Sequence, residues 1–339
     1  MNIQIMLTVM AVAAQPFIVL AATSARVIQT NAAGDNVHVI DPATNKVVGV
    51  INGIEVPHGV VISPDGARLY ITEEPTRTLD VVDAKSLRVT KKIPLSGRPN
   101  NLAVTNDGRK VYVGIAQPPG AVDVIDTVSL SKVKSIPVDG AIHNVYVTPD
   151  GKYAVAGSIP TRVMSVIDTA TNTLAWSVKL TGGIRPMAFT KNPDGSTKEI
   201  VTQLSDFHGF VLVDFATHRE VKRVTLPAVP GQEKVTDGVQ GAPSHGLAIT
   251  PDGKVLWATS KWYDFVAAYS LPDLKLLKVV QVGLHPEWLT IPPDGKTLYV
   301  AVAGKDATVA VDNKTMKVVT EIPVGYVPKR NTSGLLQTE

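Results

Sequence analysis

Seven polar side chains recur at one position of a repeated phrase in the sequence. The phrase is a hydrophobic run that ends in Asp-Gly, and six copies place the Asp at positions 65, 107, 150, 194, 252 and 294. The polar position lies seven residues before each Asp, or nine where Lys191-Asn192 is inserted, and one more interval beyond the last copy gives a seventh. We call this set the polar ring: His58, Asn100, His143, Arg185, His245, Glu287 and Lys329.

These residue types suit acid–base chemistry on a small molecule. Imidazoles and carboxylates transfer protons, and guanidinium and ammonium groups hold anions or a developing oxyanion. The ligand that this chemistry indicates is small and anionic or carbonyl-bearing. We therefore expect a catalytic group of His58, His143, Arg185, His245 and Glu287. Substrate binding is expected from Asn100 and Lys329, and from residues near connections predicted on the same face, namely Glu74, His208, Trp262 and Tyr263.

Two other interpretations of the polar ring remain open. A divalent metal is one, because imidazole and carboxylate suit zinc, copper or iron; its ligands would come from His58, His143, His245 and Glu287, with His285 as a substitute. The histidines fall on alternate repeat units, which is wide spacing for metal bonds of about 2.1 Å. The other interpretation is that the starts of the innermost strands are exposed to water, where any polar residue is tolerated and no chemical role is implied.

The elements that position the ring are predicted to be β-strands. Successive Asp residues are 42, 43, 44, 58 and 42 apart, which is the size of one propeller blade of about 40–45 residues. Each unit alternates runs rich in Val, Ile, Thr and Tyr with gaps rich in Pro, Gly, Asn and Asp. We expect an all-β, seven-bladed β-propeller of four-stranded antiparallel blades. The Asp-Gly residues themselves are expected to organise turns.

The seventh blade is predicted to form from both chain ends. The segment from Arg26 to Ile54 matches only the later part of a unit, and the chain from Pro328 onward has room for only a first strand. Pairing of the two would close the ring and remove exposed sheet edges.

Short motifs in the strands resemble a known family. Leu69-Tyr70-Ile71-Thr72, Val111-Tyr112-Val113-Gly114 and Leu298-Tyr299-Val300-Ala301 are similar to the repeats of YVTN-repeat seven-bladed β-propellers. The phrases that begin at His58 and His245, both His-Gly followed by an apolar run and Pro-Asp-Gly, resemble the blade entrances of propeller lactonases. The first resemblance implies the fold, and the second implies a site and lactone opening. Propellers host unrelated activities, so the fold does not fix the function.

Composition limits the class of protein. Residues 1–21 contain an apolar stretch with a small-residue end and are predicted to be a secretory signal peptide, so residues 22–339 form the single β-propeller domain of a periplasmic or secreted protein. The net charge of +3 has no long basic run, which argues against nucleic-acid binding. No membrane span is expected in the mature chain, and we expect a monomer. With no cysteine, a disulfide framework is excluded.

The longest interval between repeats contains the loop Pro227–Pro243, just before His245. Long loops inside compact domains commonly serve as lids. We expect this loop to cover the mouth of the channel, with a surface insertion as the alternative.

The sequence thus favours an exported hydrolase or lyase, similar to a lactonase, whose site lies at the channel mouth. One alternative is a non-catalytic periplasmic or cell-surface binding or scaffold propeller. Another is a metal- or haem-type redox protein that uses the channel histidines. No motif identifies a cofactor, because Cys-x-x-Cys-His, Gly-x-Ser-x-Gly, Walker and Gly-x-Gly-x-x-Gly patterns are all missing.

Overall fold

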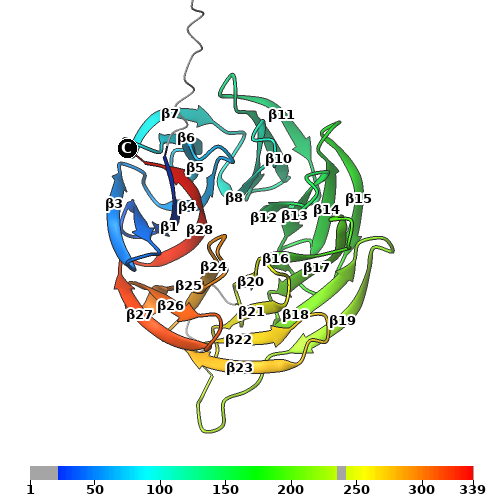
Figure 1. The fold of residues 1–339 in the computed structure, drawn as a ribbon. Coiled ribbons are helices and arrows are strands. Elements are labelled where there is room, and N and C mark those ends of the chain that lie inside the picture. The colour runs from blue at the N-terminus through cyan, green and yellow to red at the C-terminus, as the bar shows by residue number, and fades with distance from the viewer. Residues whose placement is uncertain (1–21, 235–241, 339) are drawn as a thin grey trace, which may run out of the picture.

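The computed structural model describes residues 22–234 and 242–338. The predicted signal peptide therefore lies outside the described residues. Seven four-stranded antiparallel sheets surround a central axis (Figure 1), which confirms the predicted propeller. No helix in the described ranges is long and apolar enough to cross a membrane.

Each blade runs from an innermost to an outermost strand in sequence order, except the seventh. Blades 1 to 3 are β4 (Pro57–Ile62), β5 (Arg68–Glu73), β6 (Thr78–Asp83) and β7 (Arg88–Pro94); β8 (Pro99–Val104), β9 (Lys110–Ile115), β10 (Ala121–Asp126) and β11 (Ser131–Pro137); and β12 (Ile142–Val147), β13 (Tyr153–Ser158), β14 (Val163–Asp168) and β15 (Thr173–Lys179).

Blades 4 to 6 follow the same order, and blade 6 adds the short 3-10 helix η1 (Ala303–Lys305). Their strands are β16 (Ile184–Lys191), β17 (Thr197–Leu204), β18 (Phe207–Asp214) and β19 (Arg219–Thr225); β20 (Leu247–Ile249), β21 (Val255–Ser260), β22 (Phe265–Ser270) and β23 (Leu276–Gln281); and β24 (Pro286–Thr290), β25 (Thr297–Val302), β26 (Ala307–Asp312) and β27 (Lys317–Pro323).

Blade 7 joins the two ends of the chain, as predicted. Its innermost strand is the C-terminal β28 (Pro328–Gln337), which pairs antiparallel with β1 (Thr23–Asn31), followed by β2 (Asn36–Asp41) and β3 (Lys46–Asn52). In Figure 1 the red β28 lies beside the dark blue β1. The C-terminal strand therefore closes the ring and places its own residues on the channel axis.

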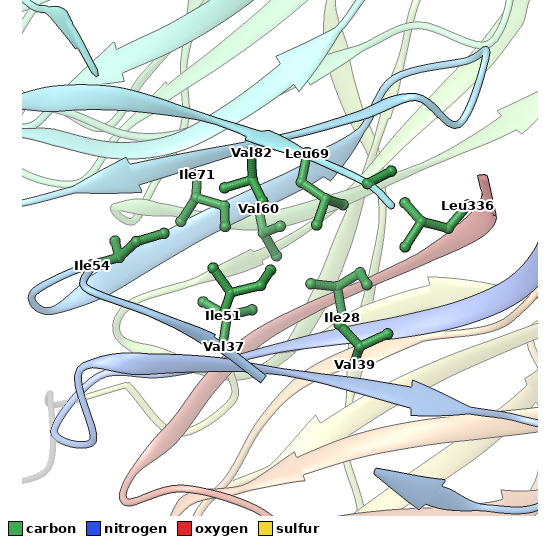
Figure 2. Close-up of a cluster of buried hydrophobic side chains, with 11 residues drawn as sticks. Ile28, Val37, Val39, Ile51, Ile54, Val60, Leu69, Ile71, Val82 and Leu336 are labelled. Atoms are coloured by element: carbon green, nitrogen blue, oxygen red, sulfur yellow. The ribbon is translucent and has the colours of Figure 1, made fainter. Parts of the chain in front are cut away.

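The core lies between neighbouring blades. At the junction of blades 7 and 1, apolar side chains of β1, β2 and β3 face those of β4, β5 and β6 (Figure 2). The interface is completed by Leu336 of the closing strand, which is 2% exposed. Burial of such side chains is the main stabilising term for stacked sheets, at roughly 1.5–3 kcal/mol each. The cluster contains Ile28, Val37, Val39, Ile51, Ile54, Val60, Leu69, Ile71, Val82, Ala84 and Leu336.

The Asp-Gly turns and the tyrosines of the repeat have structural roles. In the first turn, Asp65 accepts a 2.6 Å hydrogen bond from the Ser63 hydroxyl and a 3.0 Å bond from the Ala67 backbone N–H. The Gly that follows has a positive φ of 69°, a conformation that a side chain disfavours. The buried Tyr112 donates to Asn172 of the next blade at 2.6 Å. These contacts explain the repeat without any catalytic role.

Candidate functional site

The polar ring forms at the start of the innermost strands. Six of its members are the second residue of an innermost strand, and His245 lies two residues before β20. His143 is half-buried, and the other six are at most 7% exposed. The register in the sequence therefore places one polar side chain from each blade around the same end of the channel.

Threonines of neighbouring strands fix the backbone of the ring. Their hydroxyls bond to ring-residue backbone groups, so those groups are satisfied without water. The pairs are Thr30 Oγ1 to His58 O at 3.0 Å, Thr72 Oγ1 to Asn100 O at 2.6 Å, Thr202 Oγ1 to Arg185 O at 3.3 Å, and His245 N to Thr259 Oγ1 at 2.9 Å.

His58 forms a carboxylate–imidazole pair with Glu74. Its Nδ1 contacts Glu74 Oε1, and Arg98 holds the other carboxylate oxygen at 3.2 Å. Burial, followed by the charge of Arg330, lowers the pKa of His58 to about 4. The imidazole is therefore neutral at pH 7, and its buried Nε2 has no hydrogen-bond partner among the described residues. Such a nitrogen can accept a proton or bind a metal-containing group.

Glu287 organises a second, fully buried pair. Its Oε2 lies 2.8 Å from His245 Nδ1 and 3.5 Å from Lys329 Nζ, and its Oε1 accepts from Lys261 Nζ at 2.7 Å. Burial alone would raise the pKa of Glu287, but Lys329, His245 and Lys261 outweigh it and hold that pKa well below its usual range. The carboxylate is therefore ionised. Burial holds the pKa of His245 well below 6.5.

His143 lies beside the second pair. Its ring is 5.6 Å from that of His245 in an edge-to-face arrangement, and its Nδ1 is 2.8 Å from Asn144 Nδ2. Burial and the charge of Arg330 lower its pKa well below 6.5. The three ring histidines are thus neutral bases within a surface that also carries fixed positive charge.

A cavity of about 480 Å³, here called the upper cavity, opens among these groups. This is within the usual size of small-molecule sites, about 300–1,000 Å³. The lining combines polar ring members with apolar surface from the connections between blades. It consists of His58, Glu74, Arg98, Asn100, Ala116, Ala141, Ile142, His143, Ile159, Pro160 and Arg185.

The other predicted binding residues gather elsewhere. Trp262 stacks on His208 with ring centroids 5.0 Å apart, and Lys234 lies 4.4 Å above the Trp262 ring. Tyr263 is 6% exposed and belongs to the apolar cluster of blades 4 and 5. None of the three lines the upper cavity. They pack against the start of the long loop, and residues 235–241 of the predicted lid lie outside the described residues.

The predicted metal set does not come together as ligands. Within residues 22–234 and 242–338, no group of three or more His, Asp or Glu side chains is arranged to hold a metal ion. His285 is 7% exposed and precedes β24, where its backbone N–H donates to Asp264 at 3.1 Å. A metal held by protein side chains alone therefore lacks a ligand set among these residues.

Two buried residues of the site were not predicted. Arg330 follows Lys329 in β28 and is 1% exposed, and Trp288 follows Glu287 in β24 and is 8% exposed. The guanidinium carbon of Arg330 lies 4.1 Å from the centre of the Trp288 ring. The sequence register could have indicated both residues, because each directly follows a residue of the polar ring.

The neutral histidines predict how stability depends on pH. The unfolded chain binds protons to these imidazoles near pH 6.5, whereas folded His58 and His208 have pKa values of about 4. Between pH 6.5 and 4 the unfolded chain takes up more protons, so the free energy of unfolding falls as pH decreases. For His58 alone the loss approaches roughly 3 kcal/mol by pH 4. Urea unfolding across this range measures it, and His58→Gln should give a shallower decline; an equal slope would contradict the assignment.

Comparisons with known proteins support the fold and assign a family. Similar solved structures include the Kuenenia stuttgartiensis hydrazine synthase (23% identity, 85% of this chain and 92% of that chain, TM-score 0.72). Others are a dihydro-heme d1 dehydrogenase in complex with DHE (17%, 90% and 74%, 0.63) and a putative 6-phosphogluconolactonase from Bacteroides fragilis (18%, 91% and 98%, 0.73). At these identities the likeness shows the fold alone.

No curated protein sequence matches the chain. A family model described as the cytochrome D1 heme domain matches residues 25–236, which include the polar ring from His58 to Arg185. Because this match covers more than half of the 339 residues, the protein belongs to the cytochrome D1 heme domain family of seven-bladed propellers.

Proposed function

We propose that the protein is a hydrolase or lyase that acts on a small anionic or carbonyl-bearing substrate in the upper cavity. The observation that carries the proposal is the pair His58–Glu74. In this pair a carboxylate holds Nδ1 of a neutral imidazole, and the buried Nε2 has no partner in the part of the chain that the structure describes. A carboxylate in this place fixes the tautomer and the ring orientation of a general base.

The geometry gives each group a role in opening a carbonyl ester such as a lactone. His58 Nε2 takes a proton from water as the water oxygen attacks the carbonyl carbon. The electrons of the carbonyl π bond move to the carbonyl oxygen. Arg185 lines the same cavity and stabilises the negative charge on that oxygen. As the ester bond breaks, the leaving oxygen receives the proton from the His58 imidazolium. His245 and Glu287 form the neighbouring part of the polar ring.

A substrate screen on the purified protein tests this proposal. Over a panel of lactones and small esters, His58→Gln should lower kcat by about 10²–10⁴-fold, the usual contribution of a general base. The matched control is His218→Asn. His218 stacks on Trp176 at 3.9 Å outside the ring, and its φ of 58° suits Asn. Equal activity in the two variants would contradict the assignment, and ligand binding without turnover would favour the binding-protein alternative.

The family match favours a haem-type group as a second candidate at the same place. The donor set fits one, because His58 Nε2 is a neutral nitrogen without a partner among residues 22–234 and 242–338, and imidazole nitrogen is a common ligand of haem iron. Ile142, Ile159 and Pro160 supply apolar surface in the upper cavity, and Arg98 and Arg185 would pair with acidic substituents. When bound, the group would supply redox chemistry.

Titration with hemin tests the second candidate by absorbance. The wild-type protein should give a saturable shift of the haem absorption band, and His58→Gln should weaken or alter it while His218→Asn leaves it unchanged. Hemin that binds equally to both variants, or not at all, would rule out this use of the ring.

A further inference from the structure

Arg330 is a buried cation whose protein partners are neutral. Its Nη1 donates to Asn144 Oδ1 at 3.1 Å, its Nη2 donates to Asn100 Oδ1 at 2.5 Å, and its guanidinium lies over the Trp288 ring. Its Nε is buried and has no hydrogen-bond partner. No carboxylate of the described residues forms an ion pair with it.

This arrangement is costly for folding. The cost of removing the Arg330 guanidinium from water is offset only in part by two amide oxygens, one aromatic ring and the charges of Glu74 and Glu287, neither of which pairs with it directly. A directly paired counter-charge is what normally offsets burial of a charge. A leucine or methionine would fill the channel at less cost. The charge therefore serves something that the described residues, 22–234 and 242–338, do not provide.

The contacts of Arg330 indicate the side from which an anion could reach it. Asn100 lines the upper cavity, and its Oδ1 holds one edge of the guanidinium. Trp288 lines a separate cavity of about 370 Å³ among the later parts of the innermost strands, together with Tyr146 and Asn331. The guanidinium thus contacts one residue from the lining of each cavity, Asn100 of the upper cavity and Trp288 of the other. The charge of Arg330 also contributes to the lowered pKa values of His58 and His143.

We propose that Arg330 is the anion-binding group of the site, and that it takes a carboxylate of the ligand that enters from the upper cavity in place of Asn100 Oδ1. The Asn100 oxygen occupies the place that a carboxylate oxygen would take. A planar carboxylate can lie wholly in the plane of the guanidinium above Trp288 and match its fork with two hydrogen bonds. A phosphate can match the same fork with two of its oxygens, but its other two oxygens lie out of that plane.

This inference rests on the proposed function for the reacting end of the ligand. The carboxylate sits on Arg330 while the carbonyl or leaving group lies among His58, His143 and Arg185. The substrate class is accordingly a carbonyl compound, such as a lactone, that carries a separate carboxylate.

The test measures thermal stability and binding heat with acetate, acetamide and inorganic phosphate at constant ionic strength. Wild-type protein should be stabilised by acetate and not by its neutral analogue acetamide. Arg330→Met should weaken acetate binding by about 10–100-fold, the usual worth of charge-assisted hydrogen bonds. The near-isosteric Asn100→Asp supplies an internal carboxylate, so it should abolish the acetate response and raise the melting temperature.

Arg223→Met is the matched control, because Arg223 also lies over an aromatic ring, Phe207 at 4.7 Å, but is exposed. It should keep the acetate response. The inference is overturned if the wild type does not respond to acetate, if phosphate alone stabilises it, or if Asn100→Asp keeps the wild-type response. Turnover retained in His58→Gln would instead overturn the proposed function and leave the acetate result standing.

Discussion

Glu287→Gln should destabilise the protein by about 3–5 kcal/mol, the usual result of removing one partner from a buried ion pair. The side chain is fully buried, and it is the carboxylate shared by Lys261, Lys329 and His245. The amide keeps the shape but takes away the negative charge, so two buried ammonium groups lose the carboxylate between them. Chemical denaturation at pH 7 measures the difference.

A matched surface pair provides the control. Glu321 accepts from Lys305 Nζ at 2.5 Å with about half of its side chain exposed, so Glu321→Gln should change stability by less than about 1 kcal/mol. Adding Lys329→Met to Glu287→Gln removes one of the two cations and should recover part of the loss. If Glu287→Gln behaves like Glu321→Gln, the cluster does not hold the ring together.

The sign of the acid dependence follows from the same carboxylate. The pKa of Glu287 is held well below its usual range in the folded protein, so its contribution is present at neutral pH and is lost as pH falls through the folded pKa. The contribution of the ring histidines to the free energy of unfolding begins to fall at a higher pH, near 6.5, where the histidines of the unfolded chain take up protons. As pH decreases, stability should therefore begin to fall with the histidines and continue to fall with Glu287. Glu287→Gln should remove the part due to Glu287 and, because that carboxylate raises the pKa of His245, should also lower the pKa of His245 further.

The fold and the polar ring could be predicted because equivalent positions of the sequence units take equivalent places in the blades. A residue that lies seven positions before an Asp-Gly turn, or nine in blade 4, lies at or just before the start of an innermost strand. Counting was therefore enough to bring His58, His143 and Glu287 to one end of the channel. The insertion of Lys191-Asn192 lies at the end of β16 and the turn that follows, after Arg185, so it does not disturb that register. Three strands of a blade at the N-terminal end and one at the C-terminal end left closure as the only consistent arrangement.

The contacts inside the channel could not be predicted in the same way. Seven-fold counting places residues in a ring but does not say which ones touch across it. Arg330 of blade 7 reaches Asn100 of blade 2 and Asn144 of blade 3, because its side chain is long enough to span a narrow channel. Glu74 meets His58 through a connection whose length differs among blades. His208 and Trp262 were expected to bind substrate, and the structure shows them stacked on each other with Lys234 over the Trp262 ring.

Ending the chain at Gly325 should abolish cooperative folding, a loss that amounts to most of a typical stability of 5–15 kcal/mol. The missing strand β28 pairs with β1 from Thr23↔Gln337 to Asn31↔Pro328, and it supplies Leu336 to the core between blades 7 and 1. Without it, β1 becomes an exposed edge that invites aggregation. Far-ultraviolet circular dichroism during thermal and urea unfolding measures the effect.

The control ends the chain at Gln337. Among described interactions this removes only the two hydrogen bonds that Thr338 donates to Ala22 O, at 2.9 Å from its backbone N–H and 3.5 Å from its hydroxyl. This variant should melt within a few degrees of the full chain. A synthetic peptide of residues 326–339, added to the shorter protein, should restore a cooperative transition in a concentration-dependent manner, because it can pair with β1 as β28 does. A shortened protein that melts like the full chain would show that the ring is stable while open. Since Lys329 and Arg330 arrive with this strand, the peptide should restore the acetate response and the fold at the same concentration, and a peptide with Arg330→Met should restore the fold alone.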